Sequence, residues 1–185
     1  MPNFTRKAIK DSFMKLLNQK PLNQITVKDI VEDCGINRNS FYYHFEDMPS
    51  LLEELIREEA ERIIKDYPTI DSIEECLSVA VQFALDNKKA AYHIYNSVNN
   101  PMYVQHFLNI CEYVVTTYIN TAFKDTPVKD EDKKIIIRFY KCECFGQIID
   151  WLNGGMKDDI TASFKRLCEL RKGMAEELFR RSMEL

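Results

Sequence analysis

Hydrogen-bond donors and aromatic rings gather in the segment between residues 26 and 45, which reads TVKDIVEDCGINRNSFYYHF. Arg38 can bind guanine O6 and N7 through two hydrogen bonds, and Asn39 can bind adenine N6 and N7 in the same way. Tyr42 and His44 suit contacts to the phosphates beside such bases. A short helix that lays its first turn in the major groove would bring these side chains to a duplex. The segment is therefore predicted to read double-stranded DNA.

Two helix starts and one tight break are needed to present that helix, and the same segment encodes them. Thr26 can cap a helix that begins at Val27, with Asp29 as the reciprocal partner of a capping box. Gly35 follows where a left-handed residue ends a helix, and Asn37 can cap the next one. This pattern predicts a helix-turn-helix, although an ordinary corner between two helices would carry the same signals.

Composition and periodicity predict an all-α fold. The chain has 185 residues, of which 45% are hydrophobic, so it can bury a full core. Apolar residues recur at helical spacing, as Phe41 and Phe45 do, and no long run of alternating β-branched residues suggests a strand. We expect about nine helices, in a DNA-binding domain over residues 1–47 and a larger domain over residues 48–185. The helix over residues 48–66 would connect the two rigidly.

Charge is distributed unevenly along the chain. The net charge is −4, which would be unusual for a nucleic-acid-binding protein if it were spread evenly. Residues 1–20 hold five basic groups and one acidic group, a balance of +4, whereas residues 48–185 hold 18 basic and 23 acidic groups, a balance of −5. The basic end precedes the predicted reading helix, as a protein that meets phosphate with one end requires. Arg6 and Lys7 are expected near phosphate, while Lys15 and Lys20 fit a solvated helix face equally well.

The N-terminal segment resembles the DNA-binding domain of the TetR family of bacterial transcriptional regulators over about residues 5–65. The residues that carry the resemblance are Thr26, Ile30, Gly35-Ile36, Asn37, Asn39-Ser40, Tyr42, His44-Phe45 and the cap Asp47. Two positions depart from the family pattern, because Met48 replaces the usual phosphate-binding lysine and Asn39 replaces a frequent glycine or proline. The resemblance implies DNA contacts from Thr26, Lys28, Arg38, Asn39, Ser40, Tyr42, Tyr43 and His44.

Aromatic and soft apolar side chains in the second domain could line a pocket for an effector. They are Tyr92, Tyr95, Met102, Tyr103, Phe107, Cys111, Tyr118, Phe139 and Tyr140. The alternative for each is an ordinary core position with a tyrosine hydroxyl at the rim. An effector, whether a small molecule or a protein, must prefer one spacing of two reading helices, since a ligand with equal affinity for both states shifts nothing.

The last two predicted helices, over residues 131–152 and 161–181, carry more apolar surface than one face can bury. Packing this pair against its copy would give a symmetric four-helix seam, with Gly146 and Gly173 allowing close approach. The predicted interface residues are Phe145, Ile148, Ile149, Leu152, Phe164, Leu167, Met174 and Leu178. The family resemblance implies the same homodimer. Two reading helices about 34 Å apart would meet successive major grooves of a palindromic operator.

Other chemistry has little support in the sequence. The six cysteines lack CxxC spacing and lie mostly on apolar helical faces, which favours buried free thiols over a metal site or a redox sensor. The three histidines have no metal-ligand or catalytic spacing, and no nucleophile motif or glycine-rich phosphate loop occurs. We therefore expect no enzyme activity, metal or cofactor. The absence of a secretory signal and of a long apolar run predicts a cytoplasmic protein.

These features together predict a homodimeric transcription factor, in the simplest case a repressor that leaves its operator when the C-terminal domain binds an effector. Activation of transcription is an alternative, and so is control by a partner protein in place of a small ligand. A partner-controlled protein would show an exposed apolar patch.

Overall fold

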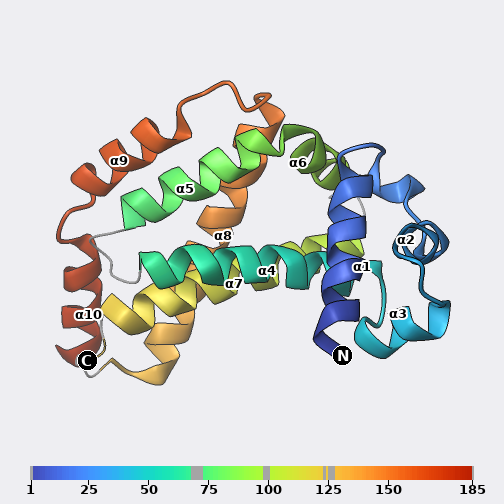
Figure 1. Cartoon of the computed structure of the whole chain (residues 1–185). Helices are drawn as coiled ribbons and strands as arrows, with labels where there is room; N and C mark the ends of the chain where they lie inside the picture. Colours follow the sequence, from blue (N-terminus) through green and yellow to red (C-terminus); the bar gives the residue numbers. More distant parts are fainter. Residues whose placement is uncertain (1, 68–72, 98–100, 123, 125–127, 185) are drawn as a thin grey trace. The chain divides into compact units, whose positions relative to one another are not determined.

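The computed structural model describes residues 2–67, 73–97, 101–122, 124 and 128–184 of the chain. Within these ranges it contains ten α-helices, one short 3-10 helix and no strand, so the predicted all-α fold is confirmed (Figure 1). None of the described helices combines the length and apolar character that a membrane crossing needs. The elements are α1 (Pro2–Leu17), η1 (Leu22–Gln24), α2 (Val27–Cys34), α3 (Arg38–His44), α4 (Met48–Asp66), α5 (Ile73–Asp86), α6 (Lys88–Tyr95), α7 (Pro101–Ala122), α8 (Asp130–Asn153), α9 (Ile160–Leu170) and α10 (Met174–Glu184).

The end of the chain differs from the prediction of one helix over residues 161–181. Two helices, α9 and α10, lie there, and a turn over residues 171–173 separates them. Gly173 has a φ of 86°, a left-handed conformation that glycine adopts without a steric penalty. The apolar spacing continues through the break, because Leu170 and Met174 are four positions apart. Periodicity alone therefore could not reveal the turn.

Side-chain and backbone hydrogen bonds fix both ends of α2. Thr26 Oγ1 accepts a hydrogen bond from the Asp29 N–H at 3.2 Å, and the Thr26 N–H donates to Asp29 Oδ2 at 2.8 Å. This reciprocal pair is the predicted capping box. Gly35 ends the helix with φ 69° and ψ 33°, and its N–H donates to the Val31 carbonyl. The left-handed glycine turns the chain toward α3, as the sequence predicted.

Asn37 and Asp47 start α3 and α4 in a similar way. Asn37 Oδ1 accepts from the Ser40 N–H at 2.8 Å, and Asp47 Oδ1 accepts from the Ser50 N–H at 2.8 Å. Ser50 Oγ in turn accepts from the Asp47 N–H at 3.1 Å. Each cap satisfies a backbone donor that the first turn of a helix leaves without an internal partner. Both predicted helix starts are confirmed.

Two compact units divide the chain. The first combines Met1–Glu59 with Phe83–Phe107, and the second combines Ala60–Gln82 with Leu108–Leu185. The first unit thus holds α1, α2, α3, the start of α4, all of α6 and the start of α7. The helix-turn-helix lies entirely within it.

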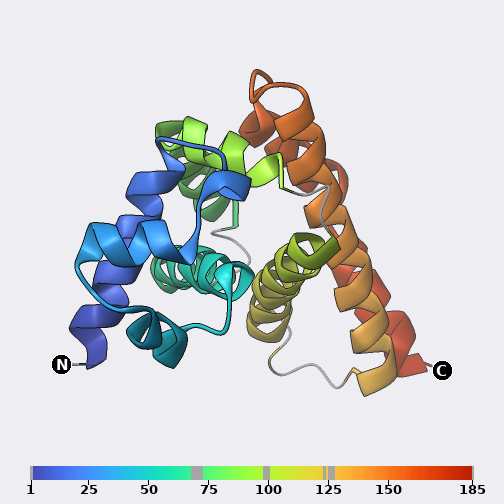
Figure 2. The same cartoon turned by 90° about the vertical axis from the view of Figure 1, so that its right-hand side faces the viewer.

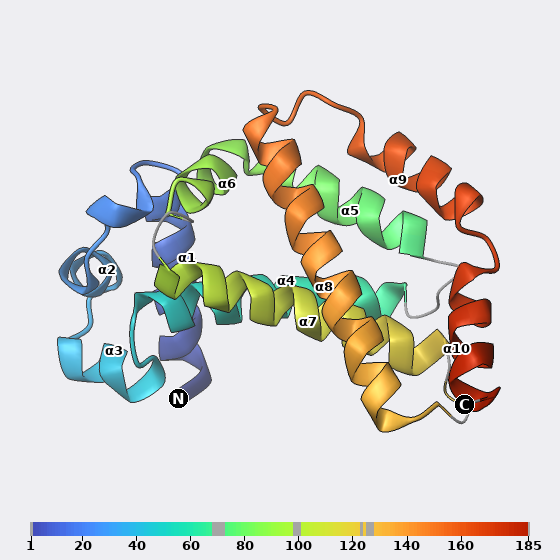
Figure 3. The ribbon, with the colours of Figure 1, turned by 180° about the vertical axis from the view of Figure 1, so that it is seen from behind.

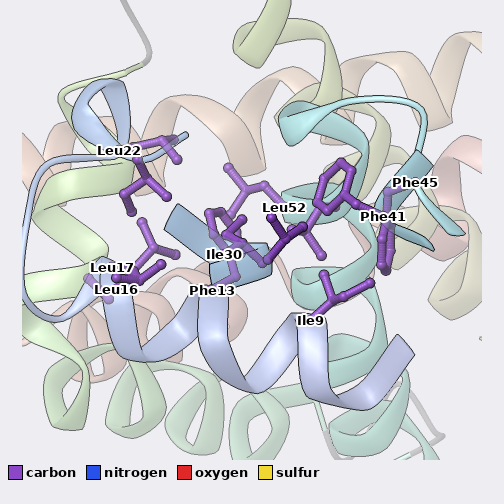
Figure 4. Packing of buried hydrophobic residues seen from close by; sticks show 13 residues of the cluster. Ile9, Phe13, Leu16, Leu17, Leu22, Ile30, Phe41, Phe45 and Leu52 are labelled. Carbon is purple, nitrogen blue, oxygen red and sulfur yellow. The ribbon is translucent and has the colours of Figure 1, made fainter. Parts of the chain in front are cut away.

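The core of the first unit forms where α1, α2, α3 and α4 meet (Figure 4). Its fully buried side chains are Ile9, Phe13, Leu17, Leu22, Ile30, Phe41, Leu51 and Leu52. Burying an apolar side chain of this size contributes roughly 1.5–3 kcal/mol. Ala90 of α6 belongs to the same cluster and is 2% exposed. Phe41 is the α3 side chain in this cluster, and its burial there fixes the orientation of α3.

Two histidines from later helices bond to the N-terminal helices inside the first unit. His93 Nδ1 of α6 lies 2.6 Å from the Leu17 carbonyl oxygen at the end of α1. In the tautomer that carries a proton on Nδ1, this imidazole satisfies one of the last carbonyls of α1. His106 Nδ1 of α7 hydrogen-bonds to Glu53 Oε2 of α4. The segment after residue 83 therefore completes the unit that carries α3.

The second unit packs α7 against the end of α4 and against α8. Tyr118 of α7 is buried, and its hydroxyl donates to the Tyr67 carbonyl at 2.6 Å. Figure 3 shows α8 crossing the C-terminal part of α7, and Figure 2 shows α8 beside α7 in a view turned by 90° from Figure 1. At this crossing Lys141 Nζ lies 2.7 Å from Glu112 Oε2. The crossing holds α8, which carries half of the predicted dimer residues, against α7.

Candidate nucleic-acid interface

The α3 helix has one buried face and one exposed face. Phe41 and Phe45 enter the core with 0% and 3% exposure, and their ring centroids lie 5.9 Å apart. Away from the core, Tyr42 and Tyr43 are 57% and 79% exposed. Because packing of the phenylalanine face fixes the rotation of the helix, the two tyrosines are held toward solvent. This is the orientation that a reading helix requires.

The first turn of α3 presents the side chains predicted to read bases. Arg38 and Asn39 directly follow the cap Asn37, and both are exposed. Ser40 is half-buried, and its hydroxyl donates to Asn37 Oδ1 at 3.1 Å. Ser40 therefore supports the cap, whereas Arg38 and Asn39 extend from the helix start into solvent.

The start of α2 holds two more of the predicted contacts. Thr26 is exposed, and its hydroxyl donates to Asp29 Oδ2 at 2.7 Å. Hydrogen bonds from Thr26 and then from Lys20 lower the pKa of Asp29 to about 2. Lys28 is exposed, and its ammonium lies 3.6 Å from Glu32 one turn along the helix. Exposed pairs of this kind contribute little, so Lys28 can turn to a phosphate at small cost.

All eight predicted DNA contacts lie on α2, on α3 or at the cap before α2, within one compact unit. Ser40 and His44 are half-buried, and the His44 ring meets the Tyr43 ring edge-on with centroids 5.0 Å apart. The other six are exposed: Thr26, Lys28, Arg38, Asn39, Tyr42 and Tyr43. The two helices thus bring together side chains that the sequence spreads over 19 positions.

Two basic residues of α1 join it to α4 by ion pairs. Arg6 pairs with Glu54, and Lys10 pairs with both Glu54 and Glu58. Burial alone would raise the pKa of Glu54, but hydrogen bonds from Arg6 and Lys10 bring its pKa below the usual value. The Arg6 guanidinium also lies over the Phe45 ring, 5.5 Å from its centroid. Arg6 therefore helps to hold the end of α3, a structural role that charge counting did not indicate.

Lys15 and Lys20 are paired with acidic residues of α2. Lys15 Nζ lies 2.5 Å from Asp33 Oδ1, and Lys20 Nζ lies 3.1 Å from Asp29 Oδ2. Carboxylates of α2 and α4 therefore balance much of the positive charge of residues 1–20. Lys7 is exposed. The distribution of charge along the sequence missed this pairing because the partners come from other helices.

The predicted dimer residues lie on α8, α9 and α10 of the second unit. Ile148, Met174 and Leu178 are 42%, 51% and 41% exposed. The others are half-buried: Phe145, Ile149, Leu152, Phe164 and Leu167. Because none of the eight is fully buried, each can lose further apolar surface against a partner chain. The interface itself stays a prediction.

The residues predicted for an effector pocket divide between the two units. The first unit holds Tyr92, Tyr95, Met102, Tyr103 and Phe107, and the second holds Cys111, Tyr118, Phe139 and Tyr140. Tyr103 and Phe107 pack against the core of the first unit, while the side chain of Met102 lies outside the described part. Phe139 is 60% exposed on α8, and its ring contacts the Tyr140 ring edge-on. The pocket stays a prediction.

Two cysteine thiols meet inside the second unit. Cys111 of α7 is 5% exposed, Cys144 of α8 is half-buried, and the two thiols are hydrogen-bonded to each other. No sequence motif indicates this contact, because the residues are 33 positions apart and on different helices. Among the described side chains, no three His, Cys, Asp or Glu residues are grouped as a metal site requires.

Comparison with known protein families agrees with this geometry. Residues 11–55 match the family described as "Bacterial regulatory proteins, tetR family". Residues 71–173 match the family described as "Transcriptional regulator C-terminal region". The second match alone covers more than half of the chain.

Individual relatives are more distant. The uncharacterized HTH-type transcriptional regulator YxbF of Bacillus subtilis (strain 168) is 32% identical over 65 residues, which are 35% of this chain and only 17% of that protein. The dihydroxyacetone kinase operon activator DhaS has a TM-score of 0.61 at 20% identity, over 98% of this chain and 97% of that chain. A tetR family transcription regulator from Shewanella sp. PV-4 has a TM-score of 0.51 at 16% identity, over 97% and 94%. At these identities the two structures show a shared fold.

Proposed function

Because the chain belongs to the TetR family of bacterial transcriptional regulators, we propose that it is a homodimeric repressor that leaves its operator when its C-terminal region binds an effector. The observation that supports this proposal most is the exposed face of α3. Arg38, Asn39, Tyr42 and Tyr43 project from a helix whose other face is locked into the core. A protein that binds in this way across a promoter blocks it, so repression is the simplest outcome.

The roles of the DNA contacts follow from their chemistry and exposure. Arg38 reads guanine and Asn39 reads adenine from the first turn of α3. The other six contacts bind the sugar-phosphate backbone and set the register of α3 in the groove. They are Thr26, Lys28, Ser40, Tyr42, Tyr43 and His44.

Dimerisation places two such helices on one operator. Ile148 of α8 and Met174 and Leu178 of α10 expose apolar surface that a second copy of the chain would cover. A two-fold symmetric pair would read a palindromic site with half-sites about 34 Å apart. The two-fold symmetry of the dimer would then match the two-fold symmetry of the operator sequence.

The α4 helix offers a direct connection between effector binding and DNA binding. Its first part belongs to the unit that carries α3, and residues 60–66 belong to the second unit. A continuous helix transmits displacement along its axis, because its backbone hydrogen bonds resist bending. An effector that favours one position of residues 60–66 would therefore favour one spacing of the reading helices.

Control by a partner protein is the second candidate, and one observation favours it. Ile135 and Phe139 are 66% and 60% exposed, and their spacing of four places them on one side of α8. Neither belongs to the predicted dimer residues. An apolar pair of this kind would suit a protein partner, and such a partner could make the regulator an activator.

Operator binding is tested by comparing two exposed cations of the helix-turn-helix. Arg38→Ala should weaken binding by roughly 1–3 kcal/mol and relax base preference at one position. Lys28→Ala should weaken all sequences alike and reduce the salt slope by about one. Lys89→Ala, which removes an exposed cation of α6, serves as the control and should change neither. An Arg38→Ala protein with unaltered affinity and specificity would show that α3 reads DNA through other residues.

The dimer is tested by placing a charge on either of two apolar positions of α8. Ile148→Glu should give monomers in sedimentation, because a buried unpaired carboxylate is costly. Ile135→Glu is the matched control on the same helix and should leave the dimer and its operator affinity intact. A dimer that survives Ile148→Glu would move the interface elsewhere. If Ile135→Glu abolishes promoter control in cells while the purified dimer still binds its operator, the partner-protein alternative is favoured.

A further inference from the structure

The contact between Cys111 and Cys144 is unusual because it joins two short side chains from different helices. A cysteine side chain ends at its sulfur, so two of them meet only where the helix backbones approach closely. The ion pair between Lys141 and Glu112 fixes this approach, because Glu112 directly follows Cys111 and Lys141 lies three positions before Cys144. Residues three apart share one side of a helix, so the ion pair and the thiol pair lie on the same side of α8.

We infer that Cys111 and Cys144 form a modification site, a dithiol that a hydroperoxide oxidises to a disulfide between α7 and α8. The hydrogen bond between the two thiols brings their sulfurs into contact across α7 and α8, and a disulfide with a bond length of about 2.05 Å would join them there. This site adds to the proposed function and does not depend on DNA binding. It also differs from the expectation that the cysteines are buried free thiols and not a redox sensor.

The two thiols have different environments, which assigns them different roles. The hydrogen bond to Cys144 and burial both raise the pKa of the Cys111 thiol. The same hydrogen bond lowers the pKa of the Cys144 thiol, against the effects of burial and of Glu143. Cys111 thus donates its S–H to the Cys144 sulfur and remains protonated. Cys144 is also the more exposed of the two, so it is the thiol that a small peroxide meets first and the one that loses its proton more readily.

The reaction proceeds in two steps that together transfer two electrons. The Cys144 thiolate attacks one peroxide oxygen, the S–O bond forms, and the O–O bond breaks to release an alkoxide or hydroxide that takes up a proton. The Cys111 sulfur then attacks the Cys144 sulfenic acid and loses its proton. The S–S bond forms as the S–O bond breaks, and hydroxide leaves as water. Two thiols are oxidised, and the hydroperoxide is reduced to an alcohol, or to water in the case of hydrogen peroxide, with one further water.

Cys142 provides a matched comparison on the same helix. It is exposed, and it lies two positions before Cys144, which directs the two side chains to different sides of α8. Exposure alone would make Cys142 the first thiol to react. If the contact and the hydrogen bond between Cys111 and Cys144 determine which thiols are oxidised, these two form a disulfide while Cys142 remains a thiol.

The test uses the full-length reduced protein and hydrogen peroxide at a small molar excess. After alkylation in denaturant, mass spectrometry counts the remaining thiols and identifies linked peptides. Wild type and Cys142→Ser should each lose two alkylatable thiols and yield one Cys111–Cys144 linked peptide, which a dithiol reductant reverses. Cys144→Ser should yield no linked peptide, and circular dichroism shows whether it is folded. If Cys144→Ser does not fold, the linked peptides of wild type and Cys142→Ser still show whether Cys111 and Cys144 form the disulfide.

Three results would overturn the inference. In the first, all six thiols of the wild-type protein are still alkylated after the folded protein has been treated with peroxide. In the second, the oxidised sulfur is that of Cys142. In the third, the linked peptides join cysteines other than Cys111 and Cys144. A stable sulfenic or sulfinic acid on Cys144 without a bond to Cys111 would count against it equally, since that outcome requires the two sulfurs to be too far apart to react.

Discussion

Replacing Gly35 by alanine should destabilise the protein although the new methyl group has room. A β-carbon at Gly35 would meet no atom within 4 Å beyond its immediate chain neighbours, so no clash contributes. The backbone, however, has a φ of 69°, where an L-residue other than glycine costs about 1–2 kcal/mol. Alanine also restricts the unfolded chain, which returns about 0.4–1 kcal/mol. The strain is the larger effect, and we expect a net loss of about 1 kcal/mol for Gly35→Ala.

Urea unfolding followed by circular dichroism measures this loss as a lower midpoint with an unchanged slope. Gly35→Asn is the control, because asparagine tolerates the left-handed region better than alanine does, and it should lose less. In a chain of this size, 1 kcal/mol lowers Tm by roughly 2–4 °C. An alanine variant as stable as wild type, or an asparagine variant less stable than alanine, would refute the argument that backbone conformation selects glycine here.

Other predictions concern the core, the cap and the second unit. Phe41→Ala should cost roughly 3–5 kcal/mol in urea unfolding, because a fully buried ring leaves a cavity, and a loss below 1 kcal/mol would contradict its burial. Asp29 has its pKa lowered to about 2, so the stability it contributes is present above its unfolded pKa near 4 and is lost as pH falls toward 2. The stability difference between wild type and Asp29→Asn should accordingly shrink over that range of pH. Tyr118→Phe should cost about 0.5–1.5 kcal/mol in thermal unfolding, because it removes the hydrogen bond from the Tyr118 hydroxyl to the half-buried Tyr67 carbonyl. Oxidation of Cys111 and Cys144 closes a loop of 33 residues and should stabilise the chain by roughly 3–4 kcal/mol against urea.

The parts of the fold that sequence predicted well are those whose causes lie within one turn of helix. Thr26 bonds to Asp29 and Asn37 bonds to Ser40, in each case three residues away, so both caps are visible in the order of residue types. Gly35 is visible for the same reason, since its conformation depends on its own missing side chain. The helix-turn-helix is built from these local signals and could be placed before any tertiary contact was known.

The parts that sequence missed depend on contacts between distant positions. Arg6 pairs with Glu54 across 48 positions, and the order of residue types did not indicate this ion pair. Cys111 and Cys144 lacked any motif that would join them. The turn at Gly173 was hidden because apolar spacing runs unbroken across it. In all three cases the determining fact is which helices lie together, and composition and periodicity do not specify that.

The compact unit that carries α3 is closed by a segment that returns from far along the chain. Ala90 fills part of its core, and the His93 imidazole covers the last carbonyl of α1 contributed by Leu17. A fragment cut after residue 66 would lack both, and its apolar seam beside α1 would face water. A shortened DNA-binding fragment of this protein would therefore need α6, either in the same chain or as a separate peptide. Without α6, the fragment should be less soluble and α1 should be less firmly packed.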